Sequence, residues 1–207
     1  MVSILVLIGV TVLISYKGIK DGLFFNKNEF HIGSIQSGEQ FRMFSSGFLH
    51  VDFQHLFFNM FTLYLFAPYV VYHFSTSYFL ILYLGSLLSG SLLTLYFHKN
   101  ENHYRAVGAS GAVTGIIYSA ILIEPNIYMY GFIPGYVFGF LYLLASIYGM
   151  KTKRDNICHV AHFGGAIGGY LITLAKEPHL LIDNLEMVIL LAIPIVLLFI
   201  LAKLGKI

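Results

Sequence analysis

Four polar side chains lie in strongly apolar stretches of this sequence. His55 and Asn59 are four residues apart among leucines and phenylalanines, so both would project from one face of a helix. Ser110 lies in a Gly-Ala-Ser-Gly sequence, and His162 lies in an Ala-His-Phe-Gly-Gly sequence. A polar group at membrane depth costs a few kcal/mol unless it is paired, so these residues are the first candidates for a functional site.

The four residue types form a complete set for hydrolysing an amide. That reaction needs a nucleophile, a base that takes its proton and returns it to the leaving amine, and donors for the oxyanion. Ser110 would be the nucleophile, His162 the base, and His55 and Asn59 the oxyanion donors. The backbone N–H of Ser110 would also donate if Ser110 lies in the first turn of a helix, where N–H groups lack a helical acceptor.

Each residue also has a purely structural interpretation. A serine in a membrane helix commonly bonds a carbonyl of its own helix, and a lone histidine commonly packs or relays protons. His55 and Asn59 could bridge two helices. The catalytic interpretation is favoured because the residues complete one reaction together.

Two other motifs are excluded by their pattern. The serine motif is Gly-x-Ser-Gly with no preceding strand, unlike the nucleophile elbow of α/β hydrolases. Cys158, His159 and His162 could be read as zinc ligands, but a site needs three or four ligands and no carboxylate accompanies these three. We therefore expect no metal and no other cofactor.

The composition indicates a membrane protein. Of the 207 residues, 57% are hydrophobic and only 11% are charged, whereas a soluble domain has about 25% charged residues. The net charge of +2 is small and scattered, which argues against nucleic-acid binding. The single cysteine, Cys158, cannot form an internal disulfide and is expected to be a buried thiol. We predict one membrane domain over residues 1–207.

Several apolar runs must position the candidate residues. Each run is long enough, or nearly long enough, to cross about 30 Å of hydrocarbon as a helix, and none alternates as a barrel strand would. The fold class is therefore an all-α integral membrane protein. The runs are Met1–Tyr16, Phe44–Phe66, Tyr78–Phe97, Ala106–Ile123, Tyr130–Met150, Ile157–Ala175 and Met187–Ala202. Pro68 is predicted to end the second helix, and Pro194 to kink the seventh.

Small residues repeat at a spacing of four in three of these runs. Such residues let helix backbones approach each other in lipid. The fourth run has Gly111 and Gly115, and the sixth has Gly165 and Gly169. Gly108 and Gly111 would also leave room for a substrate backbone beside Ser110.

With these motifs, the chain resembles the rhomboid family of intramembrane serine proteases. The resemblance runs from Phe41-Arg42-Met43-Phe44 and His50, through the His55 and Asn59 segment and the Gly-Ala-Ser-Gly motif, to the histidine and glycines of the sixth run. It implies a six-helix bundle over about residues 1–176 and an additional C-terminal helix at about 187–204.

The resemblance also implies the roles of the site residues. Ser110 and His162 would form a catalytic dyad, and His55, Asn59 and the Ser110 backbone N–H would bind the oxyanion. Gly165 and Gly169 would let the sixth helix approach the fourth. The implied substrates are transmembrane proteins, cleaved in a water-filled cavity below the membrane surface without a cofactor.

The sequence departs from the family at two places. It contains no tryptophan, so the Trp-Arg pair that many members carry in the first loop is missing. Position 114 is Thr, where relatives often have an aromatic residue that stacks on the catalytic histidine. We therefore expect His162 to be held differently.

Two arguments give opposite predictions for the orientation of the protein in the membrane. The family places the amino terminus in the cytoplasm and opens its active site outward, whereas the excess of Lys and Arg in the site-side loops predicts the reverse. We expect the family orientation, in a bacterial plasma membrane, and leave the oligomeric state open. The alternative functions are a rhomboid-like pseudoprotease that binds membrane clients and a transporter or channel, although Asp52 is the one charged residue in the apolar runs, which argues against an ion path.

Overall fold

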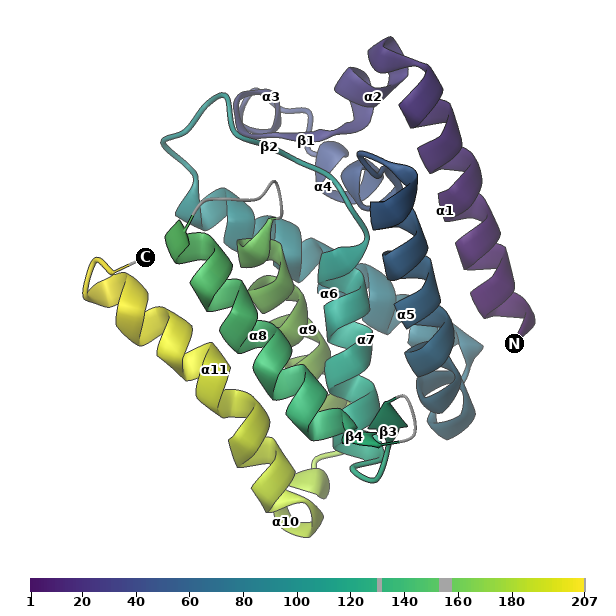
Figure 1. Cartoon of the computed structure of the whole chain (residues 1–207), viewed down its shortest axis with the longest axis vertical. Coiled ribbons are helices and arrows are strands. Elements are labelled where there is room, and N and C mark those ends of the chain that lie inside the picture. Colours follow the sequence, from purple (N-terminus) through teal and green to yellow (C-terminus); the bar gives the residue numbers. More distant parts are fainter. Residues whose placement is uncertain (130–131, 153–157, 207) are drawn as a thin grey trace.

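The fold is an α-helical bundle. The computed structural model describes residues 1–129, 132–152 and 158–206 (Figure 1). Within these residues, each predicted apolar run overlaps one long helix. The long helices are α1 (Val2–Lys20), α5 (Phe53–His73), α6 (Thr76–Phe97), α7 (Ser110–Ile123), α8 (Gly135–Thr152), α9 (His159–Lys176) and α11 (Leu185–Lys203). Tyr130, at the start of the fifth run, Ile157, at the start of the sixth, and part of the basic loop before it lie outside the described residues.

Short elements cap the two ends of the bundle. At the end where α5 and α7 begin lie α2 (Gly22–Asn28), α3 (Ile32–Gln36), α4 (Arg42–Ser45), the 3₁₀ helix η1 (Ser46–Phe48), and β1 (Phe30–His31) paired antiparallel with β2 (Arg105–Ala106). At the opposite end lie α10 (Leu180–Asp183) and the antiparallel pair β3 (Tyr128–Met129) and β4 (Ile133–Pro134). We call the first of these the site end.

The helices are those of a multi-pass membrane protein. In the described part of the chain, α1, α5, α6 and α11 are long and apolar enough to cross a membrane, while α7 and α8 are apolar but shorter. Large side chains such as Leu13, Ile81 and Phe199 are exposed on the outer helices. Lipid tolerates such an apolar exterior, which water would not.

The limits of α5 differ from the predicted ones at both ends. The helix begins at Phe53 and not Phe44, because the Asp52 carboxylate accepts a hydrogen bond from the His55 backbone N–H and caps the helix there. The prediction that Pro68 ends this helix is wrong, because α5 continues to His73. Continuing through a proline forfeits one helical hydrogen bond, whereas ending a helix in the membrane would expose several backbone groups.

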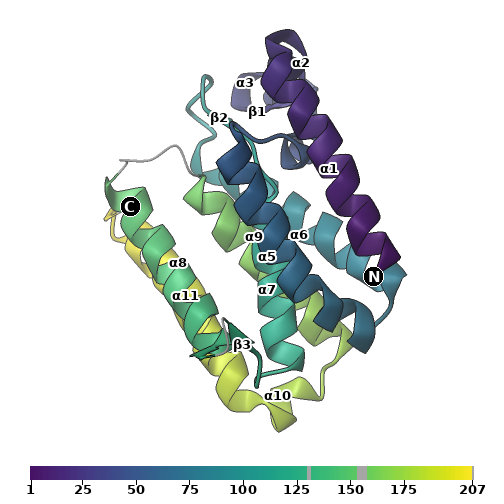
Figure 2. The ribbon, with the colours of Figure 1, turned by 45° about the vertical axis from the view of Figure 1, so that its right-hand side comes forward.

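Helix α7 is the centre of the bundle. It packs against α5, α6, α8 and α9, and it lies among these helices in both views (Figure 1, Figure 2). Every residue from Gly111 to Leu122 is buried. Ser110 is the first residue of this helix, so the bundle holds the candidate nucleophile at the site end of its most enclosed element.

Glycines set the distance between α7 and its neighbours. A Cβ on Gly165 would overlap the backbone carbonyl of Gly111, and a Cβ on Gly169 would overlap that of Gly115. On the other side of α9, a Cβ on Gly164 would lie 2.5 Å from the Ser89 carbonyl oxygen of α6. These contacts are backbone against backbone, so α9 fits between α6 and α7 only because it has no side chain at these positions.

Candidate active site

The turn before α7 presents Ser110. Gly108 has a φ of +128°, which favours glycine, and a Cβ there would lie 2.8 Å from the His55 ring. The Gly108 N–H donates to the Ser46 carbonyl at 3.0 Å, which ties the turn to η1. Ser110 then opens the helix, so its backbone N–H has no carbonyl of α7 to bind.

His50 fixes this turn from the opposite side. The Ala109 N–H donates to His50 Nε2 at 3.3 Å, so Nδ1 carries the proton and donates to Ser15 Oγ at 2.8 Å. The Ser15 hydroxyl in turn donates to the Phe48 carbonyl at 2.8 Å. Burial and the nearby His55 lower the pKa of His50 to about 3. The ring is therefore neutral at physiological pH, as a ring that accepts at one nitrogen and donates at the other must be.

His55 and Asn59 lie on the first turns of α5. The Asn59 side-chain amide donates to the His55 carbonyl at 3.0 Å, so one of its two N–H groups is held within the helix. The His55 ring stands edge-on to the His50 ring, with centroids 4.8 Å apart. Both side chains lie on the face of α5 that meets the start of α7, as their spacing predicts.

His162 is buried on α9 and is held by helix α8. It is only 4% exposed. Its Nδ1 lies 3.1 Å from Ser146 Oγ, and its Nε2 lies 3.3 Å from the Tyr142 hydroxyl. The Tyr142 and His162 rings are tilted by 31° with centroids 5.1 Å apart. Thr114, whose hydroxyl donates to the Ser110 carbonyl at 2.6 Å, contributes no aromatic ring here.

The predicted residues converge on one cavity. It has a volume of about 420 Å³, and its lining includes Ser110, His162, His55 and Asn59, which come from three helices. The hydrogen bonds of the His162 ring described above go to Tyr142 and Ser146 of α8. Asp52 also lines the cavity, at the site end of the bundle.

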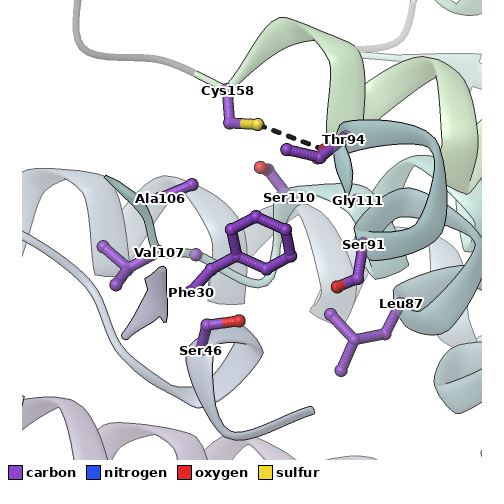
Figure 3. A pocket seen from close by; sticks show the side chains of 12 residues that line it. Phe30, Ser46, Leu87, Ser91, Thr94, Ala106, Val107, Ser110, Gly111 and Cys158 are labelled. Carbon is purple, nitrogen blue, oxygen red and sulfur yellow. Dashed lines mark hydrogen bonds between the residues drawn. The ribbon is translucent and has the colours of Figure 1, made fainter. Parts of the chain in front are cut away.

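A second, smaller cavity lies on the other side of Ser110. It has a volume of about 30 Å³, room for about one water, and Ser46, Ser91, Thr94 and Cys158 contribute polar atoms to its wall (Figure 3). The Cys158 thiol is half-buried and lies 3.5 Å from the Thr94 hydroxyl. Tyr104 donates to this sulfur at 3.2 Å. Among the described residues, no three His, Cys, Asp or Glu side chains are placed to hold a metal ion.

The first loop is anchored without tryptophan. Arg42 is buried and donates to the carbonyls of Asn26 and Glu29 at 2.8 and 3.0 Å and to the Glu39 carboxylate at 2.6 Å. The Glu29 carboxylate pairs with Arg105 of β2. Arg42 therefore connects α4 to α2 and to the residue before β1 at the site end.

Tyr142 and Ser146 are the site residues that sequence reasoning missed. They are four residues apart in an apolar run, which is the same signal that identified His55 and Asn59. Tyrosine and serine are, however, common in apolar helices, so the pair stands out only once α8 is known to face His162.

Comparison with known proteins gives a consistent result. A family model described as Rhomboid domain matches residues 37–178. The putative rhomboid protease YdcA of Bacillus subtilis (strain 168) is 31% identical over 141 residues, which cover 67% of this chain and 68% of that protein.

Longer relatives match over a smaller share of their own length. RHOMBOID-like protein 12, mitochondrial, of Arabidopsis thaliana is 28% identical over 163 residues, or 69% of this chain and 48% of that protein. The rhomboid protease GluP of Bacillus subtilis (strain 168) is 27% identical over 141 residues, or 68% of this chain and 27% of that protein. The chain thus spans about half the length of the first of these relatives.

Proposed function

Since this chain belongs to the rhomboid family, we propose that it is an intramembrane serine endopeptidase that cleaves transmembrane segments of other membrane proteins. Ser110 is the nucleophile and His162 the general base. The observation that carries the proposal is the single cavity that these two residues share with His55 and Asn59. Two relatives, GluP and YdcA, are themselves described as a rhomboid protease and a putative one.

The depth of the site suits a substrate in the membrane. Helix α7 has 14 residues, which span about 21 Å, whereas the hydrocarbon core is about 30 Å thick. If the far end of α7 lies near the opposite surface, Ser110 lies several ångströms below the near one. The cavity lined by Asp52 and Gln54 gives water a polar route to that depth.

The reaction follows from the positions of the donors and acceptors. The Ser110 hydroxyl attacks the scissile carbonyl as His162 Nε2 takes its proton, and the same nitrogen returns the proton to the leaving amine. The Ser110 backbone N–H, His55 and the free N–H of the Asn59 amide stabilise the oxyanion. Water then hydrolyses the acyl-enzyme and restores the serine.

The dyad closes only when substrate enters. In the structure the hydrogen-bond partner shown for His162 Nε2 is the Tyr142 hydroxyl at 3.3 Å. Catalytic hydrogen bonds are often long or misaligned without substrate and tighten in the complex. A substrate strand in the cavity of about 420 Å³ would displace the water there and bring Ser110 and His162 together.

The finer architecture is part of the same proposal. Helices α1, α5, α6, α7, α8 and α9 make up a six-helix core, and α11 is a seventh crossing that packs on α8. We place the protein in a bacterial plasma membrane. Cell fractionation tests whether the protein is in the plasma membrane. Extraction of that fraction at alkaline pH tests whether it is integral, because an integral membrane protein stays in the pellet.

Cleavage of a model substrate tests the activity. Purified protein in detergent should cut a single-span membrane protein that has small residues in its transmembrane segment. Ser110→Ala and His162→Ala should each abolish cleavage, while Tyr148→Leu, on the exposed face of α8, should retain it. Cleavage that persists in Ser110→Ala would overturn the assignment.

A serine-directed fluorophosphonate separates the enzyme from a client-binding pseudoprotease. The enzyme should be labelled at Ser110, and Ser110→Ala should not be labelled. A folded wild-type protein that binds transmembrane segments but neither cleaves them nor reacts with the probe would be a pseudoprotease.

A further inference from the structure

Two side chains of α8 hold the His162 ring from one side. Ser146 is 2% exposed and lies 3.1 Å from Nδ1, and the Tyr142 hydroxyl, one turn earlier, lies 3.3 Å from Nε2. Both nitrogens of the ring are thus engaged by one neighbouring helix. Residues four apart lie on one face of a helix, so a single face of α8 makes both contacts.

Each hydroxyl can donate or accept, so the two contacts fit either tautomer of the ring, and the tautomer that catalysis needs is one of them. When Ser146 accepts a hydrogen bond from Nδ1–H, Nε2 keeps its lone pair, and the Tyr142 hydroxyl donates to it. This is the tautomer that a base needs if it is to receive the Ser110 proton at Nε2. The opposite tautomer would place a proton on Nε2 and block that transfer.

The Tyr142 ring also packs against the His162 ring, whereas residue 114 of α7 is a threonine and has no aromatic ring to offer. Its plane is tilted by only 31° from that of His162, at a centroid distance of 5.1 Å. Thr114 is buried, and its hydroxyl is turned to the Ser110 carbonyl within α7. The neighbouring helix α8 therefore contributes the aromatic surface that α7 lacks.

We infer that Tyr142 and Ser146 are positioning residues for His162, Ser146 by fixing its tautomer and Tyr142 by supporting its ring with the aromatic face. The inference rests on the proposed protease function. The Tyr142 hydroxyl has a second, opposing effect, because it occupies the nitrogen that must accept the Ser110 proton. It must release Nε2 before each turnover.

The two roles predict opposite effects for two substitutions at position 142. Tyr142→Leu removes the ring and should lower kcat at least 10-fold with little change in KM. Tyr142→Phe keeps the ring and removes the competing hydroxyl, so kcat and the rate of fluorophosphonate labelling should rise about 2-fold to 10-fold, as expected for the loss of one hydrogen bond. A fall in both rates for Tyr142→Phe would overturn the competing role of the hydroxyl, and an unchanged kcat for Tyr142→Leu would overturn the ring-support role.

Ser146 is tested by removing and restoring its hydroxyl. Ser146→Ala should lower kcat about 10-fold to 100-fold at unchanged KM, and Ser146→Thr should recover most of the loss. Thermal unfolding of each variant in detergent separates a misfolded protein from a misplaced ring. Tyr148→Leu, exposed on the same helix, is the matched control and should behave as wild type.

The tautomer can be observed without any substrate. In ¹⁵N-histidine spectra, wild-type His162 should carry its proton on Nδ1, and Ser146→Ala should shift it toward a mixture of tautomers. A proton on Nε2 in the wild type, or no change in Ser146→Ala, would overturn the inference even if the enzyme is active. If the wild type does not cleave the substrate but gives the expected spectra, the proposed protease function is refuted and the assignment of the tautomer stands.

Discussion

His50 shows how a residue outside the proposed reaction can fix the proposed nucleophile. Its ring joins Ala109, the residue before Ser110, to Ser15 of α1, and through that serine to Phe48. Three separate segments therefore meet at one neutral imidazole. The sequence places His50 in the family pattern but assigns it no role, because a hydrogen bond to the backbone of a distant turn leaves no local signal.

Replacing His50 should weaken both fold and activity. His50→Ala leaves the Ala109 N–H without its acceptor in the interior, which costs about 1 to 3 kcal/mol in the free energy of unfolding. We expect kcat to fall as well, since the turn that presents Ser110 loses its restraint. Chemical denaturation in detergent and cleavage of the model substrate measure the two effects, and an unchanged kcat would contradict the second.

Acid should destabilise the protein through the same residue. The His50 pKa is about 3 in the folded state and 6.5 as a free side chain. Between these values the unfolded chain binds a proton that the folded one does not, so the free energy of unfolding falls as the pH drops below about 6.5. A single such group contributes a slope of up to about 1.4 kcal/mol per pH unit. His50→Asn should flatten the pH dependence of unfolding, whereas His103→Asn, at an exposed site, should not.

Removing a proposed oxyanion donor should slow the proposed reaction without abolishing it. Asn59→Ala eliminates the free side-chain N–H that faces the cavity, and such losses lower kcat about 10²-fold to 10³-fold. Steady-state cleavage gives the value, and KM should stay near that of the wild type. A fully active Asn59→Ala enzyme would show that the amide only bridges turns of α5.

The apolar runs predict the existence of the helices well, whereas a residue such as proline predicts their ends poorly. Contact with lipid or burial inside the bundle makes each long helix visible as a nearly uncharged stretch, so every long helix overlaps a predicted run. Pro68 was misleading because one lost hydrogen bond does not end a membrane helix. The contact of α8 with His162 was not foreseen, since the sequence does not say which face of α8 meets α9.

The contact between α7 and α9 depends on its glycines. Gly165→Ala adds a methyl group against the Gly111 carbonyl, with no flexible side chain to give way. Overpacking of this kind costs about 1 to 3 kcal/mol, and it would also move His162 away from Ser110. We expect a lower melting temperature and little cleavage. Gly9→Ala in α1 is the control, because a Cβ at this position would have no atom within 4 Å. It should retain the melting temperature and the cleavage activity of the wild type.

Across the whole molecule the basic residues are concentrated at the site end. They occupy the end of α1, α2, α4, β2 and the end of α11, while α9 ends in Lys176 at the opposite end (Figure 1). The positive-inside rule would place the site end in the cytoplasm, whereas the family orientation places it outside. Two of these charges, Arg42 and Arg105, are paired with carboxylates of the same end.

We expect the family orientation. In a Cys158→Ala background, a membrane-impermeant maleimide added to intact cells should label Lys99→Cys at the site end and not Lys176→Cys. The reverse pattern would mean that the charge distribution sets the orientation. Labelling after lysis controls for the reactivity of both positions.

The enclosure of α7 has a consequence for where substrates are cut. The outer helices are in contact with lipid, and four of them, α1, α5, α6 and α11, have 19 to 22 residues and are about 28 to 33 Å long. Helix α7, in contrast, is held against α9 by backbone contacts. A thinner bilayer would therefore tilt the outer helices or thicken locally around them, but would not move Ser110 within the protein. A substrate helix rises about 1.5 Å per residue, so the bond that reaches Ser110 should shift along the substrate as acyl chains shorten. Hydrophobic mismatch, and not only the substrate's sequence, would then select the cleavage position.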